Sequence, residues 1–332
     1  MHRFAWIIVV AVTLGVVAGH ACAQDVLSQW TTASGAWNVA SNRIPGVAPD
    51  NGAATYAVQI GDLAPANAQV TFAPVSGLSA TVTSLSLTDG ADLSTGGYRL
   101  NILTQTTVDG AGTTLRIDAP TALGAPAFQT LMLDVQSGGA LQLNGGTLAA
   151  EQLRVDAASA LRGFGALQAG NVDAIVEQAF VNEGLIEVAG AAGSPATLTL
   201  QAIGVDVIDF DGAAEAGIVD IANAVADAGL DTLTLVVDGP LSDAFGGGGA
   251  AELHIGQRDT VTFQRNFQID AGAIIAMDGG SHVATLNGSG DATSIVDADF
   301  SIAGKATIAN DLAFVGTANT MRRYSEAQPC GF

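Results

Sequence analysis

The sequence predicts an all-β chain that folds as a parallel β-helix, and three observations lead to this class. Glycine supplies 41 of the 332 residues, well above the usual ~7 %. Charged residues make up 13 %, against roughly 25 % in ordinary globular proteins. Short apolar–polar–apolar triplets recur along most of the chain, which is typical of short strands with one buried face. Collagen and long helices are excluded, because the glycines follow no three-residue period and Glu–Lys pairs are nearly absent.

The triplets and the glycines together indicate a stack of coils. The triplets predict the strands, among them Val58-Gln59-Ile60, Leu100-Asn101-Ile102, Leu131-Met132-Leu133, Leu141-Gln142-Leu143 and Leu253-His254-Ile255. Glycine adopts positive φ without steric cost, so glycine pairs predict turns at Gly96-Gly97, Gly145-Gly146 and Gly279-Gly280. With about 20–25 residues per coil, residues 58–312 would form roughly ten to twelve coils.

Composition divides the chain into four segments. Residues 1–23 are predicted to be a secretory signal, because His2 and Arg3 precede an apolar run and Ala21-Cys22-Ala23 suits cleavage before Gln24. Lipidation at Cys22 is the alternative. We expect an N-terminal cap over 24–57, a β-solenoid over 58–316 with a sub-boundary near 205–215, and an atypical tail over 317–332. No transmembrane helix is expected after the signal, since no later stretch approaches 18 apolar residues.

The two ends of the predicted solenoid differ in character. Trp30 and Trp37 precede a loop rich in Pro, Gly and Asn, and we expect both to be buried over the first coil, because solenoid ends must be covered. A sugar-binding tryptophan pair is the alternative. The tail, with Arg322 and Arg323, loses the alternation. It is either an authentic tail or the product of a truncated or frame-shifted gene that has lost an anchor.

The charge balance excludes nucleic acid as a partner. Asp and Glu number 32 against 11 Lys and Arg, which gives a formal net charge of −21. Nucleic acids and anionic membranes both require a basic surface. Cys330 is the single cysteine expected after cleavage, so neither an internal disulfide nor a cysteine zinc site is expected. The expected partners are cell-surface or matrix components, polysaccharide among them.

Three motifs carry a resemblance to a known group of proteins. Trp30, Gly35-Ala36-Trp37-Asn38 and Pro49-Asp50 precede the first solenoid strand, Leu141–Leu148 reads L-x-L-x-G-G-x-L, and Leu161–Leu167 reads L-x-G-x-G-x-L. Together they resemble secreted bacterial β-helix repeat proteins of the autotransporter-passenger-like, PEP-CTERM-associated and planctomycete types. The resemblance implies a right-handed parallel β-helix that a diderm bacterium secretes or displays on its surface. It implies no particular activity, because these scaffolds carry many functions.

Acidic residues near the sub-boundary form the candidate metal site. Asp209, Asp211 and Glu215 surround Gly212 and offer the oxygen ligands that Ca²⁺ prefers. The remaining ligands of an EF-hand are missing, so a polar turn is the favoured interpretation of these residues and a calcium site is the alternative. We therefore expect no cofactor, with calcium as the one candidate.

A carbohydrate-active β-helix enzyme, either a polysaccharide lyase or a hydrolase, is the alternative function. Its carboxylates and base could come from Asp206, Asp209, Asp211, Arg258 and Arg265. Asp in a solenoid usually belongs to a turn, however, and no G-x-S-x-G elbow is present. Gly246–Gly249 is expected to be a flexible loop, and His254 a surface or packed residue. The sequence therefore favours an exported, non-enzymatic β-solenoid that serves as a cell-surface, matrix or adhesion module, with no catalytic residues.

Overall fold

The computed structural model describes five long segments, residues 25–50, 54–120, 126–170, 179–188 and 196–203, and then shorter strand segments. The shorter segments are 208–209, 218–220, 232–238, 243–245, 252–256, 258–264, 267–269, 274–289, 293–296, 299–308, 312–315 and 320–324. Beyond residue 201, side chains are described at 253–256, 258–262, 274–277, 283–286 and 301–308.

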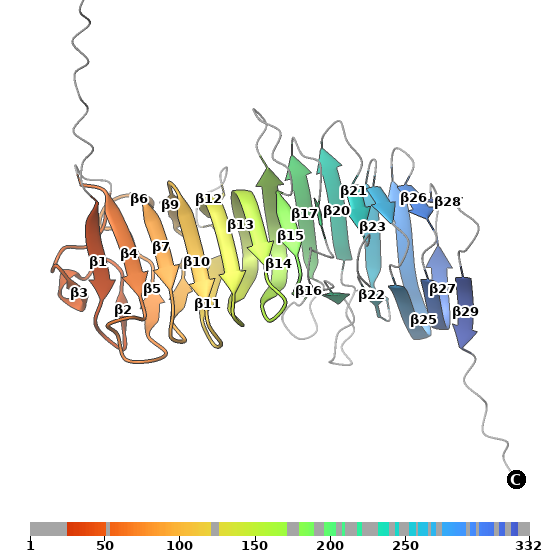
Figure 1. Ribbon diagram of the computed structural model, residues 1–332, viewed down its shortest axis with the longest axis horizontal. Helices are drawn as coiled ribbons and strands as arrows, with labels where there is room; N and C mark the ends of the chain where they lie inside the picture. Colours follow the sequence, from red (N-terminus) through yellow and green to blue (C-terminus); the bar gives the residue numbers. More distant parts are fainter. Residues whose placement is uncertain are drawn as a thin grey trace, which may run out of the picture.

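The described chain is all-β, as predicted, and its strands form an elongated stack that advances along the long axis (Figure 1). The strands fall into three ladders, A, B and C, in which each strand pairs with the strand one layer along the stack. All pairings between described strands are parallel except that of β1 with β3. The single helical element among the described residues is the short 3₁₀ turn η1 (Ala40–Asn42).

Ladder A begins at the N-terminal end of the stack and runs along one face. It contains β1 (Val26–Trp30), β4 (Tyr56–Ile60), β7 (Ser84–Leu87), β10 (Gln105–Asp109), β12 (Phe128–Gln136), β13 (Ala140–Val155), β15 (Phe180–Asn182) and β18 (Ile208–Asp209). A separate four-stranded sheet follows with β21 (Asp243–Phe245), β24 (Phe267–Ile269), β26 (Thr293–Val296) and β28 (Leu312–Val315).

Ladders B and C share several long strands with each other and with ladder A. Ladder B contains β2 (Ser34–Ala36), β5 (Gln69–Thr71), β8 (Asp92–Ser94), β11 (Thr114–Asp118), β13, β14 (Ala160–Gly170), β16 (Leu185–Val188), β19 (Ile218–Asp220), β22 (Glu252–Ile255), β25 (Ile274–Ser289), β27 (Asp299–Ile308) and β29 (Thr320–Tyr324). Ladder C contains β6 (Ser79–Val82), β9 (Arg99–Ile102), β12, β13, β14, β17 (Thr197–Ile203), β20 (Thr232–Asp238), β23 (Thr260–Gln264), β25 and β27.

The core consists of apolar side chains that lie in register from one layer to the next. The central apolar row of ladder B is fully or almost fully buried at Val70, Leu93, Leu115, Leu141, Leu161, Ile186, Leu253 and Ile275. The alternation predicted by the triplets is therefore confirmed at these positions. Burying each such side chain contributes about 1.5–3 kcal/mol to stability.

One triplet departs from the predicted alternation. In Leu131-Met132-Leu133 only Leu133 is buried, while Leu131 is 40 % and Met132 37 % exposed. The reason is that β12 passes from ladder C to ladder A between Thr130 and Met132, so the strand bends at Leu131 and the alternation restarts.

Two glycine pairs predicted to form turns lie inside long strands instead. Gly145-Gly146 lies within β13 and Gly279-Gly280 within β25, and the strand register shifts at both pairs. These pairs bend the strand from ladder B into ladder C without ending it. At Gly146 a Cβ atom would overlap the carbonyl oxygen of Ile117 in the layer below, so only glycine fits. At Gly96 and Gly97, by contrast, positive φ values of 57° and 78° form the predicted turn.

Both tryptophans of the N-terminal region are fully buried, which confirms the expected burial. The Trp30 indole Nε1 donates to the carbonyl of Thr32 at 2.7 Å, and Trp37 Nε1 donates to that of Pro49 at 3.0 Å. Trp37 packs edge-on against Phe72 with ring centres 5.2 Å apart. Strand β3 (Arg43–Ile44) runs antiparallel to β1 at this end of the stack.

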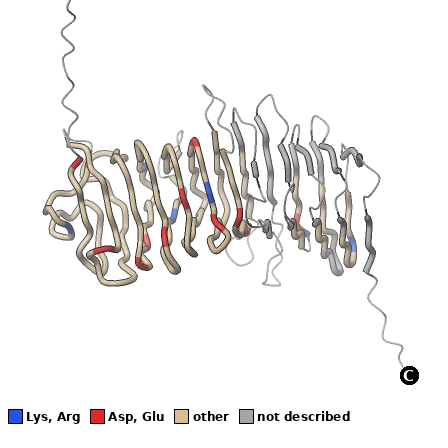
Figure 2. The backbone as a smooth tube through the Cα atoms, in the orientation of Figure 1, with Lys and Arg blue, Asp and Glu red and all other residues tan. Residues whose placement is uncertain are grey.

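Charged residues are sparse along the described backbone, and acidic segments recur at the lower edge of the stack, where strands turn (Figure 2). Among the described residues, no helix has the length and apolar character needed to cross a membrane.

Candidate functional site

An open groove of about 520 Å³ lies on the outer surface of ladder C, a volume within the ~300–1,000 Å³ typical of ligand sites. Its floor is a row of outward-facing residues on β6, β9, β12, β13 and β14, paired in register from layer to layer: Thr81, Asn101, Gln129, Ala149 and Gln168. Further lining residues lie where the strands turn toward ladder A, among them Leu103, Leu131, Glu151 and Gly170. The groove therefore crosses five successive layers, perpendicular to the strands.

The groove exists because small residues interrupt a row of long side chains. Ala149 lies in register between Gln129 and Gln168, and its single methyl group leaves space between the two amides. Gly170 leaves further space at one end and has a positive φ of 102°. Because successive side chains of a strand point to opposite faces, Ala149 points outward while its neighbours Leu148 and Ala150 are buried.

The lining combines amides, exposed aliphatic side chains and one acid. Leu103 is 55 % and Leu131 40 % exposed. Asn101 Nδ2 donates to Thr81 Oγ1 at 3.5 Å, and Asn101 Oδ1 is buried without a hydrogen-bond partner. Glu151 is the one ionisable side chain in the lining. This set suits a ligand with both hydroxyl groups and apolar C–H faces, because amides both donate and accept hydrogen bonds.

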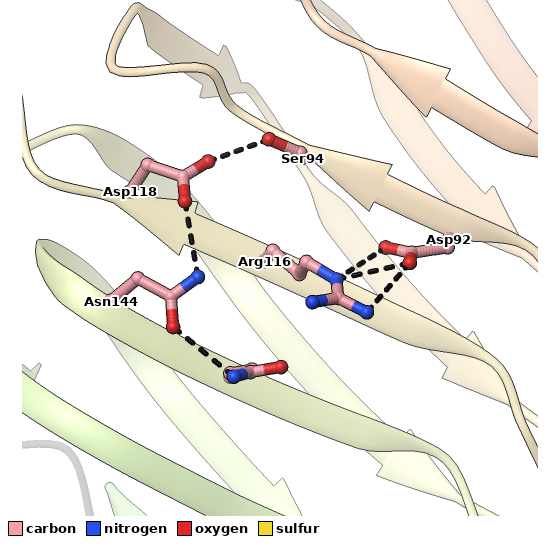
Figure 3. A network of polar contacts seen from close by, with 6 residues as sticks. Asp92, Ser94, Arg116, Asp118 and Asn144 are labelled. Atoms are coloured by element: carbon pink, nitrogen blue, oxygen red, sulfur yellow. Dashed lines mark hydrogen bonds and ion pairs between the residues drawn. The ribbon is translucent and has the colours of Figure 1, made fainter. Parts of the chain in front are cut away.

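A separate polar network lies on ladder B and ties three layers together (Figure 3). Arg116 Nε donates to Asp92 Oδ1 at 2.8 Å, and Arg116 Nη2 lies 2.8 Å from Asp92 Oδ2. The hydrogen bond to Asp92 raises the pKa of Arg116. Asp118 accepts hydrogen bonds from Ser94 Oγ at 2.6 Å and Asn144 Nδ2 at 3.1 Å. Since the partners belong to neighbouring strands β8, β11 and β13, the network stabilises the stack.

Two further ion pairs join neighbouring layers. Arg154 contacts Glu183 at 2.8 Å, and Arg162 contacts Glu187 at 3.1 Å. Arg162 and Glu187 are both exposed, so their pair contributes only about 0–1 kcal/mol, whereas the partner of exposed Arg154 is Glu183, which is only 6 % exposed. In each pair the two charged groups thus join one layer of the stack to the next.

The N-terminal cluster contains a buried arginine. Arg43 is 3 % exposed, and its guanidinium lies 5.0 Å from the Trp30 ring centre and 4.4 Å from that of Trp37. Its Nη1 donates to Ser28 Oγ at 3.0 Å and its Nη2 to the carbonyl of Trp37 at 3.1 Å. Burial lowers the pKa of Arg43 to about 10, so the side chain is protonated at neutral pH. Because both tryptophans are fully buried and pack against Arg43, neither ring has a face exposed to a sugar.

The predicted metal site falls largely outside the described residues. Of its three members, Asp209 lies in β18 opposite Val181, with no description of its side chain, while Asp211 and Glu215 are outside. Within the part of the chain that the structure describes, no group of three His, Cys, Asp or Glu side chains is arranged to hold a metal ion.

The residues proposed for an enzyme site are only partly described. Asp206 and Arg265 lie outside the described residues, as does Gly246–Gly249, the expected flexible loop. Arg258 is exposed and has a positive φ of 69°. His254 is half-buried on β22 between buried Leu253 and Ile255, and it pairs in register with Asp220 and Ala276. Its outward orientation agrees with the prediction from the alternation.

Sequence reasoning missed the groove. Some residues of the groove floor are visible in the sequence as the central polar residues of triplets, for example Asn101 between Leu100 and Ile102. The layer spacing varies, however: Asn101 pairs with Gln129, 28 positions later, and Ala149 pairs with Gln168, 19 positions later. No fixed period in the sequence could therefore align these residues.

Comparisons with protein-family models, with curated proteins and with solved structures gave no match to this chain.

Proposed function

We propose that this chain is a right-handed parallel β-helix with an N-terminal cap, related in architecture to the secreted bacterial repeat proteins that its motifs resemble. The three parallel ladders, in which each layer pairs with the next, support the β-helix. Right-handedness is supported by a general rule, since about 98 % of crossover connections between parallel strands of one sheet are right-handed. The cap is supported by β3, which runs antiparallel to the first strand, and by the Trp30–Arg43–Trp37 cluster at that end.

We further propose that it is exported and serves as a non-enzymatic cell-surface, matrix or adhesion module. The observation that carries this proposal is that charged side chains form ion pairs between neighbouring layers. Asp92 with Arg116, Arg154 with Glu183 and Arg162 with Glu187 join neighbouring layers, which is what a scaffold requires. Such a scaffold offers a long, rigid surface for contacts with cell-surface or matrix components.

A carbohydrate-active enzyme is the competing function, and the groove is the feature that favours it. Glycoside hydrolysis uses two carboxyl groups, roughly 5–10 Å apart, on either side of the scissile bond. Among the lining residues only Glu151 carries a carboxyl group. This arrangement favours binding over cleavage.

Two measurements test the proposed function. The full chain, expressed in a diderm bacterium, should leave the cytoplasm with Gln24 as its new N-terminal residue, and retention of residues 1–23 in a cytoplasmic product would contradict export. The purified product should bind intact cells or isolated matrix without releasing reducing ends or unsaturated uronides from polysaccharides. Catalytic release of oligosaccharides would overturn the non-enzymatic assignment.

A further inference from the structure

We infer that the groove on ladder C binds a single chain of an uncharged polysaccharide, laid along the long axis of the stack. This inference deepens the proposed function and rests on it, because it assigns a ligand class to a particular surface of the module. Thr81, Asn101, Gln129, Ala149 and Gln168 form the floor, and Leu103 and Leu131 form an apolar wall.

The shape of the groove fits a linear polymer. The five layers it crosses are spaced about 4.8 Å apart, so the floor is about 19 Å long. Polar side chains repeat once per layer at four of the five floor positions, and Ala149 provides the hollow between two amides. A repeating ligand can therefore meet equivalent hydrogen-bonding groups at successive layers, which a compact small molecule cannot do.

The chemistry of the lining selects hydroxyl groups and C–H faces. Gln129, Gln168 and Asn101 present amides, which donate to and accept from neighbouring hydroxyls. Asn101 is weakly held, since its one contact within the groove floor is 3.5 Å long and its Oδ1 has no partner, so its amide can reorient toward a ligand. The exposed aliphatic side chains of Leu103 and Leu131 can pack against the C–H face of a sugar ring.

The charge of the chain argues against polyanions, and the position of the groove argues against a peptide that adds a strand. The lining contains no Lys or Arg, and the chain has a formal net charge of −21, so polyanions are repelled. A peptide that adds a strand needs a free sheet edge. The floor of this groove instead lies on the face of paired strands, whose backbone groups already bond to the neighbouring layers. Side chains alone recognise the ligand here.

The experiment is affinity electrophoresis of the purified full chain in native gels that contain hydroxyethylcellulose, dextran, xyloglucan, galactomannan or polygalacturonate. Ala149→Gln fills the hollow. Its matched control is Ala140→Gln, on the same strand and equally half-buried, but on the outer surface of ladder B. Gln129→Ala removes a floor amide, and Gln152→Ala removes an exposed amide on ladder A. Circular dichroism and the melting temperature check that all four variants fold like the wild type.

At least one neutral polymer should retard the wild type, and added NaCl should leave the retardation unchanged. Ala149→Gln should weaken binding at least about tenfold, and Gln129→Ala should weaken it several-fold. The two control variants should bind like the wild type. Absence of retardation by all four neutral polymers, retardation by polygalacturonate alone, or equal binding by Ala149→Gln would overturn the inference. If the variants bind polymer equally but cells still bind the module, the groove assignment fails while the proposed function stands. If the wild type cleaves the polymer and Ala149→Gln abolishes its binding, the groove assignment stands while the proposed non-enzymatic function fails.

Discussion

The guanidinium of Arg43 lies 4.4 Å from the centre of the Trp37 ring, at the end of the stack where β1, among the described strands, pairs in parallel with β4 alone. A charged group buried this deeply must be stabilised by its surroundings. Two aromatic faces and two hydrogen bonds, to Ser28 Oγ and to the Trp37 carbonyl, supply that stabilisation. Arg43 thus links three parts of the N-terminal region into one cluster.

Replacing Arg43 by Ala should lower the free energy of unfolding by about 3 kcal/mol. Each lost cation–π contact contributes about 0.5–2 kcal/mol, and leaving Ser28 and the Trp37 carbonyl without a partner costs about 1–3 kcal/mol. Chemical denaturation measures the change. The control is Arg99→Ala on β9, where the side chain is exposed and the change should be within about 0.5 kcal/mol. Equal effects of both substitutions would rule out a stabilising role of the cluster.

The contribution of Arg43 should not depend on pH near neutrality. Burial lowers its pKa from the ordinary value of an arginine to about 10, so both the folded and the unfolded chain carry the proton below about pH 9. Above about pH 10 the folded chain releases this proton before the unfolded chain does, so the unfolded state binds more protons and stability rises with pH there. The stability difference between wild type and Arg43→Met should therefore be constant from about pH 6 to pH 9. A slope in that range would show that another group is coupled to Arg43.

The Asp92–Arg116 pair should have a small coupling energy that depends on salt. The two side chains are 22 % and 40 % exposed, so solvent screens the pair, although its geometry is bidentate. A double-mutant cycle with Asp92→Ala and Arg116→Ala should give about 0.5–1 kcal/mol at low salt and less at high salt. Arg162 and Glu187, which are 53 % and 37 % exposed, should give a smaller value in the same cycle. A larger coupling for the more exposed pair would contradict this explanation.

Gly146→Ala should destabilise the protein by about 3 kcal/mol, because the added methyl group would meet the Ile117 carbonyl of the neighbouring layer, and a backbone atom cannot move aside. Gly77→Ala is the informative comparison. Gly77 has a positive φ of 68°, yet an added Cβ would meet nothing within 4 Å. That change should cost only about 1 kcal/mol of backbone strain. If Gly77→Ala proved the more damaging of the two, close approach between layers would not explain Gly146.

The strand class could be predicted from the sequence because burial alternates with a period of two within each short segment. Leu141 and Leu143 are buried and Gln142 is not, and no distant information is needed to see this. The bends could not be predicted. A glycine pair has the same composition whether it ends a strand, as at Gly96-Gly97, or bends one, as at Gly145-Gly146, and the difference depends on the neighbouring layer.

The groove could not be predicted for a similar reason. Ala149 marks a hollow only because Gln129 and Gln168 lie on either side of it in the stack, at unequal distances along the chain. The burial of Trp30 and Trp37 could be predicted because the end of the stack must be covered. The burial of Arg43 could not be predicted, because an arginine in a loop rich in Pro and Gly gives no sign that it is buried.

Calcium should stabilise the chain by diffuse screening and not by binding at Asp209, Asp211 and Glu215. A net charge of −21 produces self-repulsion that any cation relieves, so Ca²⁺ and Mg²⁺ should raise the melting temperature equally and NaCl should do so at higher ionic strength. A defined site would instead saturate and discriminate between the two ions, because Ca²⁺ accepts irregular oxygen shells and Mg²⁺ does not. Thermal melting of the wild type and of Asp211→Ala in the three salts separates these outcomes. Stabilisation by Ca²⁺ alone that disappears in Asp211→Ala would establish the metal site and refute diffuse screening.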